Sequence, residues 1–148
     1  MNSYEDDLRR ALKVEFESGN LRESGACGAV FSSLSKAFPA KGSKIDWAKV
    51  PGSVERTEHD EALQPLRFVD FFNEMRLRFS LSGTVVYVGD SATPFALEGS
   101  AAAMRRALPL LLEVPQHHYL IGSQCSWCIC LTMEGDMGFG FGQKGSQS

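Results

Sequence analysis

Tandem histidines, three closely spaced cysteines and a pair of carboxylates are concentrated within residues 115–142. Cysteine sulfur and histidine nitrogen are ligands that zinc prefers in proteins. A cysteine thiol beside a histidine is also a pairing that nucleophilic enzymes use. The residues concerned are His117, His118, Cys125, Cys128, Cys130, Glu134 and Asp136. A metal site, a catalytic site or a binding surface is therefore to be sought first in this part of the chain.

The three cysteines have the spacing C-x-x-C-x-C. Cys128 and Cys130 are two residues apart on an expected strand, so their side chains should point to the same face. A structural zinc site needs four ligands, usually with its cysteines on tight turns, and the chain has no second C-x-x-C motif. We therefore expect thiols packed in a sheet, with no metal and no cofactor. A zinc-binding structural module remains an alternative.

The two histidines follow one another on an expected strand, so alternation should send His117 and His118 to opposite faces. At most one of them could then serve as the base for a cysteine nucleophile. The sequence marks neither an oxyanion hole nor a third member of a triad. We expect one histidine to be hydrogen-bonded in the core and the other to be exposed. No catalytic residue is predicted, and a small cysteine- and histidine-dependent enzyme is kept as the alternative function.

Glycines dominate the end of the chain. The segment Glu134-Gly-Asp136 fits a turn between two strands better than a carboxylate pair for acid–base chemistry. From Gly138 to Gly142 glycine alternates with phenylalanine, and no helix follows, so this is not a phosphate-binding loop. The glycine side of this strand should allow a neighbouring backbone to approach closely.

The composition is that of an ordinary globular domain. The chain has 148 residues, of which 43% are hydrophobic and 22% charged, enough for one domain with a core. The longest apolar stretch, near residues 108–112, contains a proline, so no transmembrane helix is expected. The acidic N-terminus lacks the apolar segment of a signal peptide. We therefore expect a cytoplasmic protein with reduced cysteines.

The net charge of −3 is unevenly distributed. Residues 55–148 hold eleven acidic and seven basic residues, which gives −4 for this part of the chain. No cluster of basic residues suggests a nucleic-acid partner. An acidic surface would instead attract a basic protein.

The helices and strands expected from the sequence form a single α+β domain over residues 1–142, followed by a flexible tail at 143–148. Apolar spacing, caps and proline positions predict helices over residues 3–19, 24–38, 65–79 and 100–115, the last interrupted at Pro109. Strands are predicted over residues 84–88 and 94–97, with three more between 115 and 142. We expect an antiparallel sheet formed mainly by the C-terminal half and packed with three to four helices.

The segment over residues 39–64 reads as a long polar loop. Its one tryptophan, Trp47, should attach the loop to the core, because tryptophan is usually largely buried. Loops of this length are often functional.

Three segments of the C-terminal part together resemble one group of bacterial immunity proteins. They are Leu108-Pro-Leu-Leu-Leu-Glu-Val-Pro-Gln-His-His-Tyr-Leu-Ile, Ser126-Trp-Cys-Ile-Cys and Thr132-Met-Glu-Gly-Asp-Met-Gly-Phe-Gly. The group accompanies contact-dependent growth-inhibition toxins and related polymorphic toxins, and the likeness covers residues 84–142. It implies a cytoplasmic protein without catalytic residues. It also implies one partner, the C-terminal domain of the cognate toxin, whose active site or substrate access the protein blocks.

Many toxins of such systems are nucleases with basic surfaces, so the resemblance points to acidic residues as the toxin-binding surface. Complementary charge would speed the encounter with a basic toxin. The candidates are Glu55, Glu58, Asp60, Glu61, Asp70, Glu74, Asp90, Glu134 and Asp136. The resemblance itself assigns no interface residue and no oligomeric state.

Overall fold

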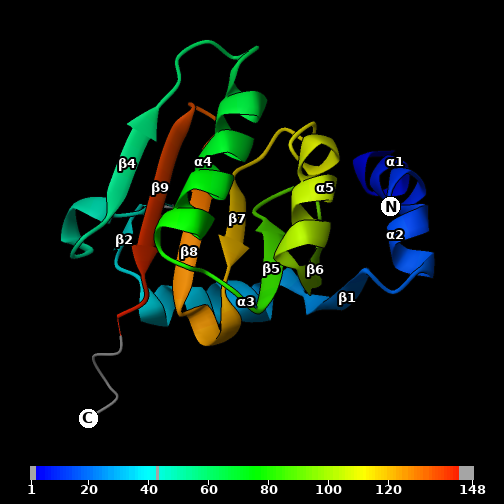
Figure 1. Cartoon of the computed structure of the whole chain (residues 1–148), viewed down its shortest axis with the longest axis horizontal. Helices are drawn as coiled ribbons and strands as arrows, with labels where there is room; N and C mark the ends of the chain where they lie inside the picture. The colour runs from blue at the N-terminus through cyan, green and yellow to red at the C-terminus, as the bar shows by residue number, and fades with distance from the viewer. Residues whose placement is uncertain (1–2, 43, 144–148) are drawn as a thin grey trace.

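The computed structural model describes residues 3–42 and 44–143 and confirms the α+β fold. Its main feature is a seven-stranded antiparallel sheet with the order β1-β6-β5-β7-β8-β9-β4 (Figure 1). The strands are β1 (Leu21–Ala26), β4 (Val54–Thr57), β5 (Thr84–Gly89), β6 (Phe95–Ser100), β7 (His118–Ile121), β8 (Trp127–Leu131) and β9 (Asp136–Phe141). A separate short hairpin joins β2 (Ala40–Lys41) to β3 (Lys44–Ile45). As predicted, the C-terminal half supplies most of the large sheet, while β1 and β4 form its two edges.

Helices cover both faces of this sheet. The α-helices are α1 (Ser3–Ala11), α2 (Lys13–Glu17), α3 (Cys27–Ala37), α4 (Gln64–Arg78) and α5 (Ala101–Leu111), with short 3-10 turns η1 (Trp47–Lys49) and η2 (Ser123–Cys125). Helices α4 and α5 lie on one face, and α3 crosses the other (Figure 1). Helices α1 and α2 lie at the end of the molecule beside α5 (Figure 1).

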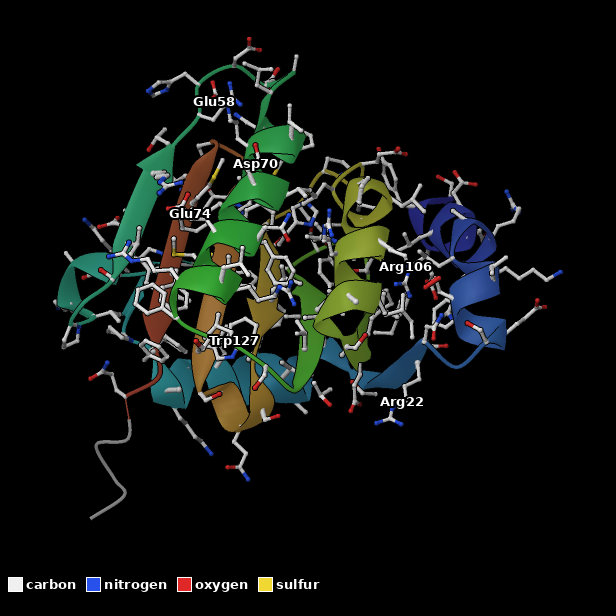
Figure 2. The ribbon with its side chains drawn as sticks, in the orientation of Figure 1. Arg22, Glu58, Asp70, Glu74, Arg106 and Trp127 are labelled. Carbon is white, nitrogen blue, oxygen red and sulfur yellow. The ribbon has the colours of Figure 1, made fainter. Side chains whose placement is uncertain are left out.

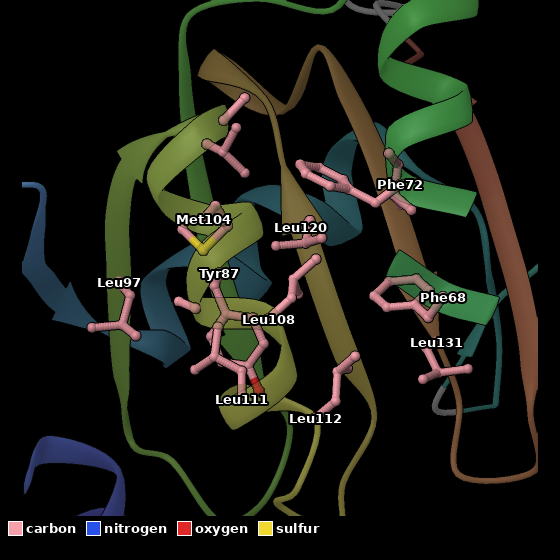
Figure 3. Packing of buried hydrophobic residues seen from close by; sticks show 14 of the residues in the cluster. Phe68, Phe72, Tyr87, Leu97, Met104, Leu108, Leu111, Leu112, Leu120 and Leu131 are labelled. Atoms are coloured by element: carbon pink, nitrogen blue, oxygen red, sulfur yellow. The ribbon is translucent and has the colours of Figure 1, made fainter. Parts of the chain in front are cut away.

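The larger hydrophobic core lies between the sheet and the α4–α5 pair. Phenylalanines at helical spacing make the inner face of α4, and Phe68 and Phe72 are completely buried there. Figure 3 shows them beside Leu120 of the sheet, with Leu108 and Leu111 of α5 packed alongside. Burying each such side chain contributes about 1.5–3 kcal/mol, so this face anchors the fold.

The second core lies on the opposite face, under α3 and η1. Trp47 is 8% exposed and covers Gly138 and Gly140 of β9, which confirms that it attaches its segment to the core. The glycine side of β9 is therefore closely approached, but by side chains at Gly138 and Gly140 and not by the neighbouring backbone that was predicted. At Gly138 the neighbour is the indole of Trp47, and a backbone oxygen comes close only at Gly142.

The predicted helix over residues 24–38 begins too early. Residues 24–26 belong to strand β1, and α3 starts only at Cys27. Strand β1 pairs with β6 through an irregular register between Glu23 and Ala26, and Gly25 has a left-handed φ of +107°. Only Leu21 of this strand is buried, so its sequence lacks the alternation that marks a half-buried strand.

The predicted long loop over residues 39–64 is wrong in detail. It contains the β2–β3 hairpin, η1 and the edge strand β4. Strand β4, Val-Glu-Arg-Thr, has one apolar residue and gains its structure by pairing with β9. Only residues 58–63 remain as the connection to α4.

Two helices also differ from prediction. The expected helix over residues 3–19 is split at Leu12 into α1 and α2, and α2 ends at Glu17. In α5, the Ser100 hydroxyl caps the start by accepting a hydrogen bond from Ala103 N at 3.1 Å, as its sequence position suggested. Helix α5 continues through Pro109 and ends at Leu111 rather than at residue 115. Pro109 cannot donate to the carbonyl four residues earlier, and only two helical residues follow it before the helix ends.

The predicted tail falls mostly outside the described residues, which end at Gln143. Gln143 itself is held to α3, because its N–H donates to the carbonyl of Ala37 at 2.7 Å.

Candidate functional site

The cysteines of the C-x-x-C-x-C segment point into the second core. Cys128 and Cys130 lie on one face of β8, as predicted, and Cys125 of η2 joins the same cluster. Burial raises the pKa of the Cys128 thiol well above its usual value and that of Cys130 to about 12. These thiols are therefore protonated at neutral pH, whereas a cysteine nucleophile needs a lowered pKa.

The two histidines are both buried, which corrects the expectation that one would be exposed. The Nδ1 atom of His118 lies 2.7 Å from the Tyr87 hydroxyl. On the other side of the strand, His117 Nδ1 accepts a hydrogen bond from the backbone of Met133 at 2.9 Å. The backbone N–H of His117 donates to Asp90 Oδ1, also at 2.9 Å. Both imidazoles thus have structural partners, and alternation does send them to opposite faces.

Metal-ligating residues do not converge in the described part of the chain. No group of three or more histidine, cysteine, aspartate or glutamate side chains there is arranged to hold a metal ion. Within the same residues, no helix combines the length and apolar character needed to cross a membrane.

We expect the cysteines to differ sharply in reactivity. Cys27 is partly exposed, whereas Cys125, Cys128 and Cys130 are buried. Titration of the native protein with a thiol reagent such as dithionitrobenzoate should modify one thiol rapidly, and the other three only after unfolding in denaturant. Rapid modification of Cys125, Cys128 or Cys130 in the native state, located by peptide mass spectrometry, would contradict the buried thiol cluster.

Two cavities open around the β2–β3 hairpin, on the face of the sheet that carries α3. A cavity of about 390 Å³ opens between α3 and the hairpin, and another of about 570 Å³ opens between the hairpin and β9. Both are lined by Tyr119 of β7 and by Lys44 and Ile45 of the hairpin. We call the two cavities together the hairpin groove.

The groove exists because the second face of the sheet is incompletely covered. Helix α3 contacts β1, β5 and β6, whereas η1 contacts β9. The central strand β7 lies between these two covered regions, and its Tyr119 forms the groove floor shared by both cavities. The apolar stripe predicted for the second helix supplies one wall, with Phe31 packed edge-on against the Tyr119 ring at 5.3 Å.

The structure brings four of the nine predicted acidic residues to this groove. Asp90 lines the smaller cavity, and Glu55 and Asp136 line the larger one. Glu134 reaches it through Lys44, whose Nζ lies 2.6 Å from the Glu134 carboxylate, and this contact lowers the pKa of Glu134. Four carboxylates from three separate segments of the chain therefore surround one hollow.

Three of these carboxylates lack a lysine or arginine partner among the described residues. Glu55 is exposed on β4 without a salt bridge, and Asp136 accepts a hydrogen bond only from the Thr57 hydroxyl among side-chain partners, at 2.9 Å. Asp90 Oδ2 has His117 Nε2 as its nearest potential cation, at 4.0 Å. Lys44 is paired with Glu134, and Lys41 also lines the larger cavity. Among the described residues the groove thus has three carboxylates without a lysine or arginine partner against one unpaired lysine, which leaves an excess of negative charge at its rim.

The remaining five predicted acids form a different surface. Figure 2 shows Glu58, Asp70 and Glu74 along α4 and the loop before it, and Asp60 and Glu61 belong to that loop. Two of the five are paired with arginine. Glu74 receives a two-pronged contact from Arg56, with one bond at 2.7 Å, which lowers its pKa, and Glu58 lies 3.4 Å from Arg67. Among the described residues, the other three, Asp60, Glu61 and Asp70, have no lysine or arginine partner, but no cavity as large as those of the hairpin groove is found beside them.

Sequence reasoning missed the aromatic and apolar residues of the groove. Tyr119 lies in the predicted strand directly after the two histidines, and nothing in the sequence showed which segment would pack over it. The alternation of that strand was the one available signal, because it places Tyr119 on the same face as His117 and Ile121.

Comparison with known proteins gives no relative to guide the assignment: no protein-family model and no curated protein matches this chain.

Proposed function

We propose that this protein is a cytoplasmic immunity protein that binds the C-terminal domain of a cognate toxin and blocks the toxin's active site or access of its substrate. The acidic residues of this chain fit a toxin domain with a basic surface. The observation that carries the proposal is the hairpin groove. There, among the described residues, three carboxylates lack a lysine or arginine partner: Asp90 beside the mainly apolar smaller cavity, and Glu55 and Asp136 beside the larger, more polar one. Protein interfaces combine such features, with apolar anchors at the centre and polar groups at the rim.

The chemistry of the C-terminal segment supports binding over catalysis. The cysteine thiols have raised pKa values, and the two histidines are engaged in structural hydrogen bonds. The motifs that resemble immunity proteins lie on β7, β8 and β9, which form the floor and one side of the groove. In this proposal those residues build the scaffold, and the acidic rim meets the toxin.

Co-expression tests the proposal. The gene immediately upstream should encode a protein whose C-terminal domain is toxic alone and harmless when this protein is present. The two purified proteins should also form a one-to-one complex by size-exclusion chromatography with light scattering. If the neighbouring domain is neither toxic nor bound, the immunity function is wrong.

An interface at the groove has a second consequence. Complementary charge accelerates association, and salt screens it. Raising the salt from 50 to 500 mM should lower the association rate with the toxin domain by about tenfold or more. A rate that does not change with salt, measured by stopped-flow fluorescence or biolayer interferometry, would contradict electrostatic capture.

A further inference from the structure

The floor of the hairpin groove holds a hydroxyl group that no described residue satisfies. Tyr119 is only 3% exposed, and its side chain lines both cavities. Its one described side-chain interaction is the edge-on ring contact with Phe31. Among the described residues the Tyr119 hydroxyl oxygen is not one of the fully buried polar atoms that lack a partner, so it is open to the cavity. An accessible hydroxyl that no described protein group pairs is free to hydrogen-bond with a group from another molecule.

Asp90 lines the same cavity. Asp90 holds the β7 backbone with Oδ1, which accepts the hydrogen bond from His117 N at 2.9 Å. Its Oδ2 has no closer described cationic group than His117 Nε2 at 4.0 Å. The smaller cavity thus offers two acceptors, the Tyr119 hydroxyl and Asp90 Oδ2. Its one basic lining residue among those described, Lys44, is paired with Glu134. Its walls are otherwise mainly apolar and come from Phe31, Leu34, Phe38, Pro39 and Ile45.

On the basis of the proposed function, we infer that this cavity receives an arginine side chain of the toxin domain. The guanidinium donates hydrogen bonds to Asp90 Oδ2 and to the Tyr119 hydroxyl, while its aliphatic stem packs against the α3 wall. A guanidinium suits two acceptors because it presents several N–H donors in a planar fork and also packs against aromatic rings. An uncharged apolar side chain would bury the carboxylate and leave the hydroxyl unpaired.

Two variants of the cavity separate charge from shape. Asp90→Asn removes the charge and retains an oxygen that accepts the His117 N–H. Ser35→Arg changes an exposed residue of α3 that lines the same cavity, and it places an internal guanidinium where the toxin's would bind. Each should weaken binding of the neighbouring toxin domain by roughly 30-fold or more, because an anchoring charge pair is lost or blocked. Tyr119→Phe should weaken it by about fivefold, the effect of one hydrogen bond.

The matched control is Glu17→Gln on α2. It removes one exposed carboxylate from a helix that contacts the edge strand β1, far from the groove at β7 and β9. The affinity should change by less than about twofold, because an exposed charge outside the interface contributes little. Affinities are measured by isothermal titration calorimetry, and thermal unfolding followed by circular dichroism verifies that each variant is folded. If Asp90→Asn is unstable, Ser35→Arg still decides, because it alters only an exposed position.

A double-mutant cycle identifies the partner residue. Each arginine of the toxin domain is changed to alanine and combined with Asp90→Asn, and one of them should couple to Asp90 by about tenfold or more. Coupling to a lysine, or to no basic residue, would overturn the arginine assignment. If wild-type protein binds and protects while Asp90→Asn and Ser35→Arg bind within twofold of it, the cavity inference is wrong and the immunity function stands. If wild type itself neither binds nor protects, the immunity function fails.

Discussion

Replacing Gly138 with alanine is expected to lower the free energy of unfolding by about 3 kcal/mol, the cost of overpacking a filled core. A Cβ atom at this position would lie 2.1 Å from Trp47 Nε1 and 2.3 Å from Trp47 Cε2. The indole cannot easily move away. The Trp47 ring packs against the Phe38 ring at 5.9 Å, and the backbone carbonyl of Trp47 accepts a hydrogen bond from the Ser53 hydroxyl at 2.8 Å. The clash therefore falls on rigid groups rather than on a flexible side chain.

Urea unfolding at neutral pH measures this effect, and Gly28→Ala is its matched control. Gly28 lies in helix α3, and a Cβ there meets no atom within 4 Å. Because alanine favours a helix over glycine, this second substitution should leave stability unchanged or raise it by up to about 1 kcal/mol. Equal stability of Gly138→Ala and wild type would mean that Trp47 does not cover β9 as described. Such a result would also remove one wall of the hairpin groove.

The sequence was informative where one face of an element is fully buried. The spacing of Phe68, Phe72 and Met75 predicted α4, and these residues are indeed completely buried. The alternation around Cys128 and Cys130 likewise predicted a strand with both thiols on one face, because a strand in the middle of a sheet must match its neighbours on both sides. In such elements the local pattern and the tertiary packing require the same structure.

The edges of the sheet were not predictable in this way. Strands β1 and β4 carry mostly exposed side chains, and each owes its extended structure to one neighbour, β6 or β9. Those pairing partners are distant in the sequence, so the local β-propensity of the strand residues does not predict the strands. The short β2–β3 hairpin escaped detection for a different reason: its strands have only two residues each, too few to show an alternating pattern.

The groove escaped prediction because it is assembled from separate segments. Tyr119, Asp90 and the hairpin come from three parts of the chain, and none of them has a distinctive motif. The acidic residues were correctly identified as a class. Charge alone could not show that Asp90 and Glu55 share one hollow while Asp70 lies on the α4 side. The exposure expected for one histidine failed because the turn after β8 brings the Met133 N–H onto His117.

A buried hydrogen-bond network links the other histidine to the loop that carries Asp90. Gln116 Nε2 donates to the hydroxyls of Tyr87 and Thr93, at 3.0 Å each, and Gln116 Oε1 accepts from the backbone N–H groups of Ser91 and Ala92. The imidazole of His118 also hydrogen-bonds the backbone of Val114, which fits a proton on its other ring nitrogen. We therefore assign the Tyr87 hydroxyl as the donor to Nδ1 of His118, 2.7 Å away. The network therefore requires a neutral His118 with Nδ1 free of a proton.

This requirement makes stability depend on pH. Burial lowers the pKa of His118 from 6.5 to about 4, because the imidazolium cannot be hydrated in the core. In the unfolded chain His118 takes up a proton near its ordinary pKa, whereas the native protein resists protonation until about pH 4. The stability contributed by neutral His118 is thus complete above pH 6.5 and is lost as the pH falls from 6.5 to about 4. The total loss should be about 3 kcal/mol.

Substituting His118→Asn isolates this contribution. The Asn side-chain oxygen can still accept the Tyr87 hydrogen bond, but the residue no longer titrates. We expect the free energy of unfolding of wild type, measured by urea unfolding at half-unit steps from pH 7 to pH 4, to fall more steeply than that of the variant. The difference between the two curves should grow by about 3 kcal/mol across the window, since acidic residues titrate alike in both proteins. Parallel curves would mean that His118 already carries its proton in the native core, which would reverse the donor assignment of Tyr87 and break the chain of hydrogen bonds to Gln116.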